Sequence, residues 1–328
     1  MSSRPTPGLV SIVLPTYKRA RVLPHAIRSV LAQTYENWEL VVVDDNSPDD
    51  TAQVVADFTD PRIRYVKNDP NLKLPRALNR GFSLARGDLL TWTSDDNLYG
   101  PQAIEKMVQR LQAGGCDLVY ADYWLFSEQD EQGQPVGPQH DRLPGSVQLH
   151  KGNHIGACFM YTRRAYEAVG DYDPELFLVE DYDYFIRIAR QFTLAHIAEP
   201  MYYFRRDDDT LYLSRFAEVK ASDLLVRYKN ALLDEAGVLD ALVALLLRHA
   251  EPLRDPLLRA SRALARASGS WRVDQWQQRL MRDRLERRLR APLAAILQAH
   301  RAGQRPFGAA RDDIRTLMAG VGTLKYAS

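Results

Sequence analysis

Paired acidic side chains follow apolar runs in the first half of this sequence. Asp44 and Asp45 come directly after one such run, and Asp95 and Asp96 follow another. Carboxylate oxygens are the ligands that Mg²⁺ and Mn²⁺ prefer, and they accept hydrogen bonds from ribose hydroxyls, whereas they repel bare phosphate. Aspartate is also a common turn former, which is the alternative for either pair taken alone. Two pairs at equivalent places favour a site for a divalent cation and a nucleotide.

A third acidic cluster lies later in the sequence, at Glu180, Asp181 and Asp183. A carboxylate at this point could take the proton of a hydroxyl nucleophile as a general base, a step worth about 10²–10⁴-fold in rate. Like charges crowded together raise the pKa of a carboxyl group toward a useful range. The alternative is an ordinary acidic first turn of a helix, stabilised by the helix dipole. No His and Cys residues with zinc-ligand spacing accompany these acids.

These side chains need a scaffold, and the first half of the chain alternates short β-branched runs with helical patterns. This alternation predicts an α/β domain built on a mostly parallel sheet. The expected strands are 10–14, 38–43, 63–66, 88–92, 118–120 and 156–161. The expected helices are 21–33, a segment that ends near 58, 76–85, 101–113, 163–169 and 181–191. Residues 127–152, rich in Gly, Pro and Gln, are expected to form a long loop.

The end of the first strand excludes one common class of nucleotide site. Ligands of an open parallel sheet bind beyond the carboxyl ends of its strands. A dinucleotide-binding fold would place Gly-x-Gly-x-x-Gly there, whereas this chain has Pro15, Thr16 and Tyr17. We therefore expect Thr16 and Tyr17 to lie at the same sheet edge as the two acidic pairs.

The net charge of +1 conceals two parts of opposite sign. Residues 1–214 hold 22 Lys+Arg against 30 Asp+Glu, a balance of −8, and residues 215–328 hold 21 against 12, a balance of +9. From residue 216 onward the pattern is helical, with breaks expected near Pro292 and Pro306 among others. The sequence thus predicts an α/β domain at 1–214 and a basic, all-helical region at 215–328.

Cysteine content and the lengths of the apolar runs predict the cellular compartment of the protein. Two cysteines, Cys116 and Cys158, imply no disulfide framework and favour a reducing environment. The polar first residues have no signal-peptide core, and no apolar run approaches the roughly 18 residues of a membrane-spanning helix. We expect a cytoplasmic protein, peripheral to the inner face of the membrane if the basic helix expected at 271–290 lies on anionic lipid. A helical bundle or a subunit contact is the alternative for that helix, and dispersed arginines argue against nucleic-acid binding.

Four stretches resemble one family of enzymes, the family-2 group of GT-A-fold glycosyltransferases, and most closely its spore-coat-polysaccharide type. They are, in order along the chain, 11–17, 41–47, 93–97 and 179–183. Each stretch is a weak signal alone, and their order and spacing make the resemblance specific. It extends from Val10 to about Leu211 and implies a Rossmann-like GT-A domain with a nucleotide-sugar site.

The resemblance implies a role for each matching residue. Pro15, Thr16 and Tyr17 would line the pocket for the base and ribose. Asp44 would hydrogen-bond the base or the adjacent sugar, and Asp95 would lie near the ribose. Asp96 would be the direct metal ligand, and Asp181 would be the catalytic base.

Two further positions match the family less closely. Lys73 lies where the spore-coat type has a nucleotide-contacting arginine, so we predict the same role for it, with a solvated lysine as the alternative. Asp207 replaces the histidine of the family's Tyr-Arg-x-His stretch, which lies near the metal and diphosphate. Asp207 either adds a second oxygen ligand or leaves the ion more loosely held.

The implied reaction is the inverting transfer of a sugar from a nucleotide-diphosphate donor, UDP favoured, to a hydroxyl of a glycan or lipid-linked acceptor. Mn²⁺ or Mg²⁺ would neutralise the leaving diphosphate as a Lewis acid. Cell-surface polysaccharide synthesis is the setting that the family suggests. Two rival functions are a sugar-nucleotide nucleotidyltransferase, although such enzymes need a Gly-rich phosphate loop after the first strand, and a non-catalytic nucleotide- or sugar-binding module.

Overall fold

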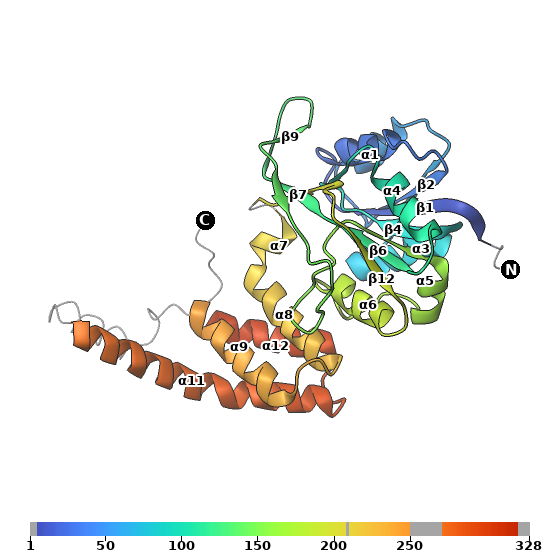
Figure 1. Cartoon of the computed structure of the whole chain (residues 1–328). Helices are drawn as coiled ribbons and strands as arrows, with labels where there is room; N and C mark the ends of the chain where they lie inside the picture. Colours follow the sequence, from blue (N-terminus) through green and yellow to red (C-terminus); the bar gives the residue numbers. More distant parts are fainter. Residues whose placement is uncertain (1–4, 208–209, 250–270, 321–328) are drawn as a thin grey trace. The chain divides into compact units, whose positions relative to one another are not determined.

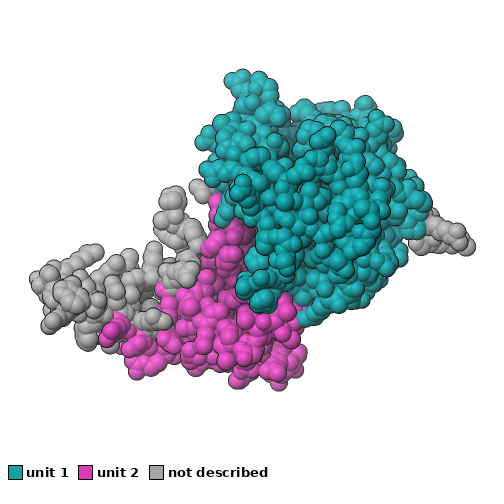
Figure 2. Space-filling model, in the orientation of Figure 1, with its two compact units in different colours: residues 1–210 teal, residues 211–328 magenta. Residues whose placement is uncertain are grey.

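The computed structural model describes residues 5–207, 210–249 and 271–320 of the 328-residue chain. It divides into two compact units, Met1–Thr210 and Leu211–Ser328, which Figure 2 shows in teal and magenta. The change from acidic to basic composition falls close to this division.

A seven-stranded sheet forms the centre of the first unit (Figure 1). Its strands lie in the order β12-β6-β11-β4-β1-β2-β3. Their bounds are β1 Thr6–Thr16, β2 Trp38–Asp44, β3 Ile63–Lys67, β4 Gly87–Trp92, β6 Leu118–Ala121, β11 Phe159–Thr162 and β12 Leu194–Ile197. Only β11 runs antiparallel to its neighbours, β4 and β6, and the other pairs in this sheet are parallel. The predicted mostly parallel α/β fold is therefore confirmed.

Helices cover both faces of this sheet because alternate strand residues point to opposite sides. Val10, Ile12 and Leu14 of β1 lie in one apolar core, and Val13 lies in the other. The first core also receives α1 (Leu23–Leu31), α2 (Thr51–Ala56) and α4 (Ala103–Gln112). The second receives α3 (Leu74–Leu84), α5 (Arg163–Val169) and α6 (Glu180–Ala189). The result is a three-layer α/β/α unit that holds the carboxyl ends of its central strands in fixed positions.

Close packing of α3 on the sheet requires a glycine. A Cβ atom at Gly81 would lie 2.3 Å from Cγ1 of Val13, far inside any real contact distance. A side chain there would push α3 away from β1. Lys73 directly precedes this helix.

A second, four-stranded sheet has the order β10-β7-β13-β5 and was not predicted. Its strands are β5 Leu98–Tyr99, β7 Tyr123–Phe126, β10 Gln139–Asp141 and β13 Tyr202–Arg205. The loop expected at 127–152 is wrong in part, because it contains β10 and a hairpin of β8 (Glu128–Gln129) and β9 (Pro135–Val136). These strands have only two to four residues each, which is too short for a periodic signal.

The second unit consists, over its described residues, of helices joined by short turns, as predicted. It contains α7 (Leu211–Ser214), α8 (Phe216–Lys229), α9 (Glu235–His249), α11 (Trp271–Arg301) and α12 (Phe307–Gly320). Helix α9 contacts α8 and α11, and α12 contacts α8 and α11. The buried side chains Leu225, Leu246 and Leu293 belong to three of these helices. The contacts describe a small helical bundle.

One expected break in this region is wrong. Helix α11 continues through Pro292, whereas α12 begins directly after Pro306 as expected. Proline removes one backbone hydrogen bond, but Leu289 and Leu293 on either side of it are buried and hold the helix in place. The side chains of 271–278, at the start of the basic helix expected at 271–290, lie outside the described residues. None of the described helices is both long enough and apolar enough to span a membrane.

Candidate functional site

The strand register brings three of the predicted segments to one edge of the main sheet. Thr16 at the end of β1 is paired with Asp44 at the end of β2. Val13 is paired with Trp92 at the end of β4, and the backbone N–H of Thr93 donates to the Val13 carbonyl at 3.0 Å. Asp95 and Asp96 come shortly after, so the carboxyl ends of β2 and β4, on either side of β1, supply the two acidic pairs.

Asp44 is fully buried, and both of its carboxylate oxygens are bonded to the protein. Oδ1 accepts the backbone N–H of Ser47 at 2.8 Å, and Oδ2 accepts the Tyr65 hydroxyl at 2.6 Å. Burial raises the pKa of Tyr65, and the Asp44 carboxylate raises it further. Ser47 in turn accepts the backbone N–H of Lys18 through its Oγ at 3.0 Å. Asp44 therefore shapes the loop after β1 and β2 from inside the fold.

The neighbouring Asp45 holds the segment that leads to Lys73, a role that the sequence did not predict. Its Oδ1 accepts the Asn68 side-chain amide at 2.9 Å and the Leu72 backbone N–H at 2.8 Å. Its Oδ2 accepts the backbone N–H of Lys73 at 2.8 Å. These bonds fix Lys73 in the left-handed region, with φ 69°, and leave its side chain exposed at the sheet edge.

Pro15, Thr16 and Tyr17 lie at the end of β1 with different exposures. Pro15 and Thr16 are buried, and Pro15 is paired with Val43. Tyr17 is 43% exposed, with the Lys18 ammonium 5.1 Å from its ring centroid. An exposed aromatic ring at a sheet edge provides a surface on which a flat base can stack.

Asp95 and Asp96 form a pair of largely buried carboxyl groups. Burial raises the pKa of Asp95, and the Asp96 charge raises it further. Burial also raises the pKa of Asp96, whereas the guanidinium groups of Arg19 and Arg205 lower it. Nη2 of Arg19 lies 3.9 Å from Oδ2 of Asp96. Two adjacent carboxylates in a low-dielectric place require positive charge nearby, and this site supplies part of it from arginine.

Asp207 lies close enough to Asp96 for its charge to raise the pKa of Asp96. Its Oδ2 accepts Nε of Arg205 at 2.5 Å, and the Arg205 backbone N–H donates to Oδ1 of Asn97 at 2.8 Å. Strand β13 thus brings Asp207 to the acidic loop that follows β4.

These carboxylates fit a divalent cation that shares its ligands with a diphosphate. Within the described ranges, no group of three or more His, Cys, Asp or Glu side chains is arranged to hold a metal by itself. Mg²⁺ commonly binds one or two carboxylates and takes its remaining ligands from substrate phosphates and water. Asp96 with Asp207 nearby meets this requirement, and both are oxygen donors of the kind that Mg²⁺ and Mn²⁺ prefer.

Asp181 lies in the first turn of α6, where the positive end of the helix dipole stabilises a negative charge. Its Oδ1 accepts the Tyr182 backbone N–H at 2.7 Å, and its Oδ2 accepts Nδ2 of Asn153 at 3.0 Å. Glu180 beside it is 4% exposed. Burial, and then the Asp181 charge, raise the pKa of Glu180 to about 8.

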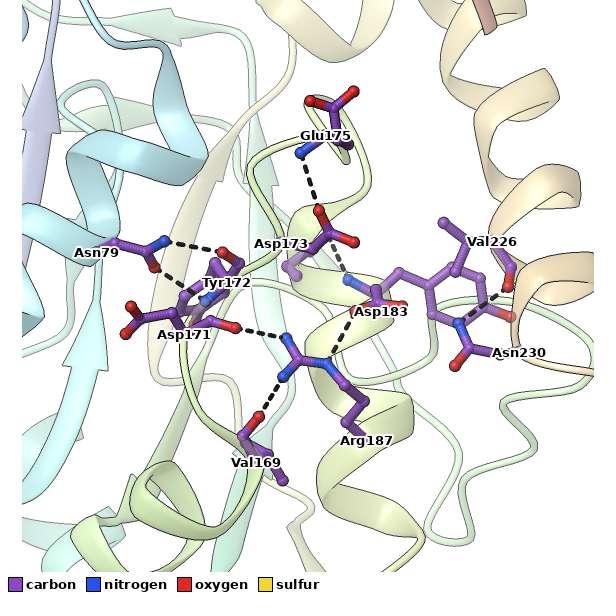
Figure 3. A network of polar contacts seen from close by, with 12 residues as sticks. Asn79, Val169, Asp171, Tyr172, Asp173, Glu175, Asp183, Arg187, Val226 and Asn230 are labelled. Atoms are coloured by element: carbon purple, nitrogen blue, oxygen red, sulfur yellow. Dashed lines mark hydrogen bonds and ion pairs between the residues drawn. The ribbon is translucent and has the colours of Figure 1, made fainter. Parts of the chain in front are cut away.

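Arg187 fixes α6 to the segment that precedes it (Figure 3). Its Nε donates to the fully buried Asp183 at 2.9 Å, and its two terminal nitrogens donate to the carbonyl oxygens of Val169 at 2.6 Å and Asp171 at 2.9 Å. Asn79 of α3 holds the same segment, with its side-chain amide bonded to the N–H and the carbonyl of Tyr172 at 2.9 and 2.8 Å. The first turn of α6 is therefore held from the sheet side.

Tyr172 connects the region of Asp181 with the end of β4. Burial raises the pKa of its hydroxyl far above the ordinary range, the Asp181 charge raises it further, and the Trp92 side chain lowers it. Trp92 is the last residue of β4, directly before the segment that holds Asp95 and Asp96. One buried tyrosine is thus within interaction range of Asp181 and of Trp92, three residues before Asp95, so the first turn of α6 lies near the end of β4.

Known proteins resemble this chain in sequence. Residues 11–170 match the model of Glycosyl transferase family 2. A glycosyl transferase of Escherichia coli (strain K12) named for colanic acid biosynthesis, WcaA, is 33% identical over 190 residues, which are 56% of this chain and 67% of WcaA. The chain spans only 35% of the length of two longer Rickettsia glycosyltransferases that are 31% and 30% identical to it.

Two solved structures share the fold. Staphylococcus aureus TarS 1–349 in complex with UDP is 17% identical, with a TM-score of 0.52 over 97% of this chain and 93% of that one. The Pyrobaculum calidifontis mannosyltransferase PcManGT in complex with GDP-Man and Mn²⁺ is 18% identical, with a TM-score of 0.52 over 87% of this chain and 86% of that one. The similarity to WcaA shows the family, and the chain therefore belongs to glycosyltransferase family 2.

Proposed function

We propose that this chain is an inverting, metal-dependent glycosyltransferase. It transfers a sugar from a nucleotide-diphosphate donor to a hydroxyl group of a glycan or lipid-linked acceptor, in the synthesis of a cell-surface polysaccharide. The observation that carries the proposal is the placement of two acidic sets in one unit, Asp95 and Asp96 after β4 and Asp181 at the start of α6. The motifs at 93–97 and 179–183 favour the spore-coat type within the family.

A uridine nucleotide is the favoured donor. TarS binds UDP and PcManGT binds GDP-Man in their solved structures, which supports a nucleotide-sugar donor for this chain as well. The exposed ring of Tyr17 stacks on the base, with Pro15 and Thr16 behind it, and Asp95 lies toward the ribose. Lys73, whose side chain is exposed, contacts the nucleotide. We assign Asp44 an indirect part, because its oxygens already hold Tyr65 and Ser47.

Asp96, with Asp207 nearby, would hold the Mn²⁺ or Mg²⁺ ion, whose remaining ligands would come from the donor diphosphate and water. The bound cation supplies Lewis-acid neutralisation of the leaving diphosphate. Arg19 and Arg205 lie beside Asp96 and add fixed positive charge at the same place. The Mn²⁺ in the PcManGT structure supports the choice of ion.

Asp181 acts on the acceptor. Its carboxylate takes the proton of the acceptor hydroxyl while that oxygen forms a bond to the anomeric carbon. The bond between the anomeric carbon and the diphosphate oxygen breaks in the same step, and the electron pair leaves with the nucleoside diphosphate. One displacement from the opposite side inverts the anomeric centre.

We assign this chemistry to a transferase domain at 1–214 on the cytoplasmic side of the membrane. The basic helical region at 215–328 then serves either peripheral contact with anionic lipid or self-association. WcaA is named for the synthesis of a polysaccharide, which agrees with a glycan or lipid-linked acceptor.

The test compares wild type with Asp181→Asn, using UDP-glucose and UDP-GlcNAc with Mn²⁺ and a lipid-linked sugar acceptor. We expect the variant to keep its thermal stabilisation by UDP and to lose transfer by at least about 10²-fold, the lower range for a general base. Asp173→Asn, a change of the same chemistry in the segment before α6, serves as the control and should keep transfer. Full transfer by Asp181→Asn would overturn the base assignment. Nucleotide binding without transfer in wild type would favour a binding module, and pyrophosphate release from UTP with a sugar 1-phosphate would favour a nucleotidyltransferase.

A further inference from the structure

The loop before β11 is attached to the first turn of α6 at two points. Nδ2 of Asn153 donates to Oδ2 of Asp181 at 3.0 Å. The hydroxyl of Tyr182, the next residue of α6, donates to the carbonyl of Leu149. The loop and the helix therefore form one local structure around the Asp181 carboxylate.

The orientation of the Asn153 amide is fixed by a second bond. Its Oδ1 accepts the backbone N–H of Ile155, a fully buried residue, at 3.3 Å. Because the carbonyl end of the amide is held in this way, its N–H₂ end faces Asp181. Asp181 receives one backbone donor on Oδ1 and this side-chain donor on Oδ2, so the two bonds together set the rotation of its carboxylate.

We propose that Asn153 is a positioning residue that keeps Asp181 ionised and correctly oriented as the base. This assignment rests on the proposed function, because it gives Asn153 a part only if Asp181 accepts the acceptor proton. A hydrogen bond donated to a carboxylate stabilises the charged form and therefore lowers its pKa. Loss of the donor raises the pKa of Asp181 and frees the carboxylate to rotate.

Other charged and titratable groups belong to the elements around Asp181. They include Glu180, Tyr182, Asp183, Tyr184 and Arg187 on α6, Asp171, Tyr172, Asp173 and Glu175 in the segment before it, and His150, Lys151 and His154 on the loop that carries Asn153. Burial and the Asp181 charge raise the pKa of Glu180 to about 8, so its titration affects the alkaline side of a pH profile. The effect of Asn153 is expected on the acidic side of the pH profile, so the effects of Asn153 and Glu180 can be separated.

The most direct variant is Asn153→Asp, which keeps the shape of the side chain and an acceptor for the Ile155 N–H but replaces the donor by a carboxylate. The matched control is Asn79→Asp, which likewise keeps the acceptor for the Tyr172 N–H and loses the donor to the Tyr172 carbonyl. The Asn79 side chain bonds here to the backbone of Tyr172. Loss of its donor therefore affects the segment before α6 without removing a donor from Asp181.

The first measurement is the pH dependence of kcat/KM for UDP release from UDP-glucose or UDP-GlcNAc. We expect Asn153→Asp to move the acidic limb upward by at least about one to two pH units and to leave UDP binding unchanged, because loss of a charge-assisted hydrogen bond corresponds to a shift of that size and the new carboxylate adds like-charge repulsion in the same direction. Asn79→Asp should lower the unfolding temperature and leave the limb in place. An unmoved limb in Asn153→Asp would overturn the proposal.

The second measurement needs no substrate. In a thermal-unfolding cycle of Asn153→Ala, Asp181→Ala and the double variant, we expect the double loss in unfolding temperature to be smaller than the sum of the single losses. Strictly additive losses would contradict a coupling between the two side chains. Full transfer by Asp181→Ala would instead show that Asp181 is not the base. That outcome is distinct from one in which only the role of Asn153 is wrong.

Discussion

A buried carboxyl group beside the proposed base gives the structure a stability that depends on pH. Glu180 is 4% exposed, and its pKa is raised from 4.5 to about 8 by burial and then by the Asp181 charge. The folded state therefore holds Glu180 protonated at neutral pH, whereas the unfolded chain ionises it above pH 4.5. The contribution of Glu180 to stability is complete below pH 4.5 and is lost as the pH rises through about 8.

Glutamine reproduces the neutral form of Glu180 in nearly the same shape. At pH 7 the solution is about 2.5 units above the ordinary pKa of Glu180. Wild type has therefore lost roughly 3 kcal/mol of this stabilisation, at 1.36 kcal/mol per unit. We therefore expect Glu180→Gln to be more stable than wild type, and its advantage should grow by about 4 kcal/mol from pH 5 to pH 8. In a unit of this size, each 1 kcal/mol shifts the unfolding temperature by about 2–4 °C.

The assay is unfolding by urea, followed by tryptophan fluorescence at pH 5, 6, 7 and 8. Comparing the variant with wild type at each pH cancels the titration of groups that the substitution does not affect. Glu175→Gln is the control, because Glu175 is exposed on the segment before α6 and its variant should differ from wild type by a constant amount. A constant difference for Glu180→Gln as well would mean that Glu180 is ionised in the fold at all these values, and the reasoning from burial would be refuted.

Two other substitutions test the sheet edge. Asp96→Ala should abolish the part of the UDP-induced thermal shift that depends on Mn²⁺. In wild type, ligand at 100 times its Kd stabilises the fold by about 2.7 kcal/mol. An undiminished shift in the variant would exclude Asp96 as the metal ligand. Tyr65→Phe leaves Oδ2 of the fully buried Asp44 without its 2.6 Å donor and should destabilise the first unit by about 1–3 kcal/mol in a urea titration, whereas an unchanged midpoint would mean that Asp44 finds another donor.

The layers of the first unit could be predicted from the sequence because they follow from local periodicity. Alternating apolar residues in β1 divide between two cores, and the helical spacing between the strands identifies the elements that cover them. The second sheet could not be predicted in this way. Its pairs, such as Tyr99 with Tyr202 and Trp124 with Tyr203, join two- to four-residue strands from distant parts of the chain. Such strands form because the tertiary structure brings them together, not because of their own propensity.

The same limit applies within the site. The positions of the acidic pairs at the sheet edge follow from strand ends, but the roles within a pair depend on the course of the loop beyond the strand. Asp44 points into the fold to Tyr65, and Asp45 accepts the N–H groups of the segment before α3. Asn153 lies 28 positions from Asp181, and only the path of the loop before β11 brings the two together.

Two pairs of neighbouring acids in this unit meet the same electrostatic difficulty, and in each pair burial and the neighbouring charge raise the pKa of one carboxyl group, Asp95 in the first and Glu180 in the second. Carboxylates next to each other in a low-dielectric place repel strongly, so positive charge must be near or one group must keep a proton. Beside Asp96, the guanidinium groups of Arg19 and Arg205 lower its pKa and oppose the effect of burial. Beside Asp181, Glu180 keeps its proton to about pH 8. A neutral Glu180 removes one of the two negative charges from that pair, and this lowers the electrostatic cost of a carboxylate at Asp181, the form that a general base for an acceptor hydroxyl requires.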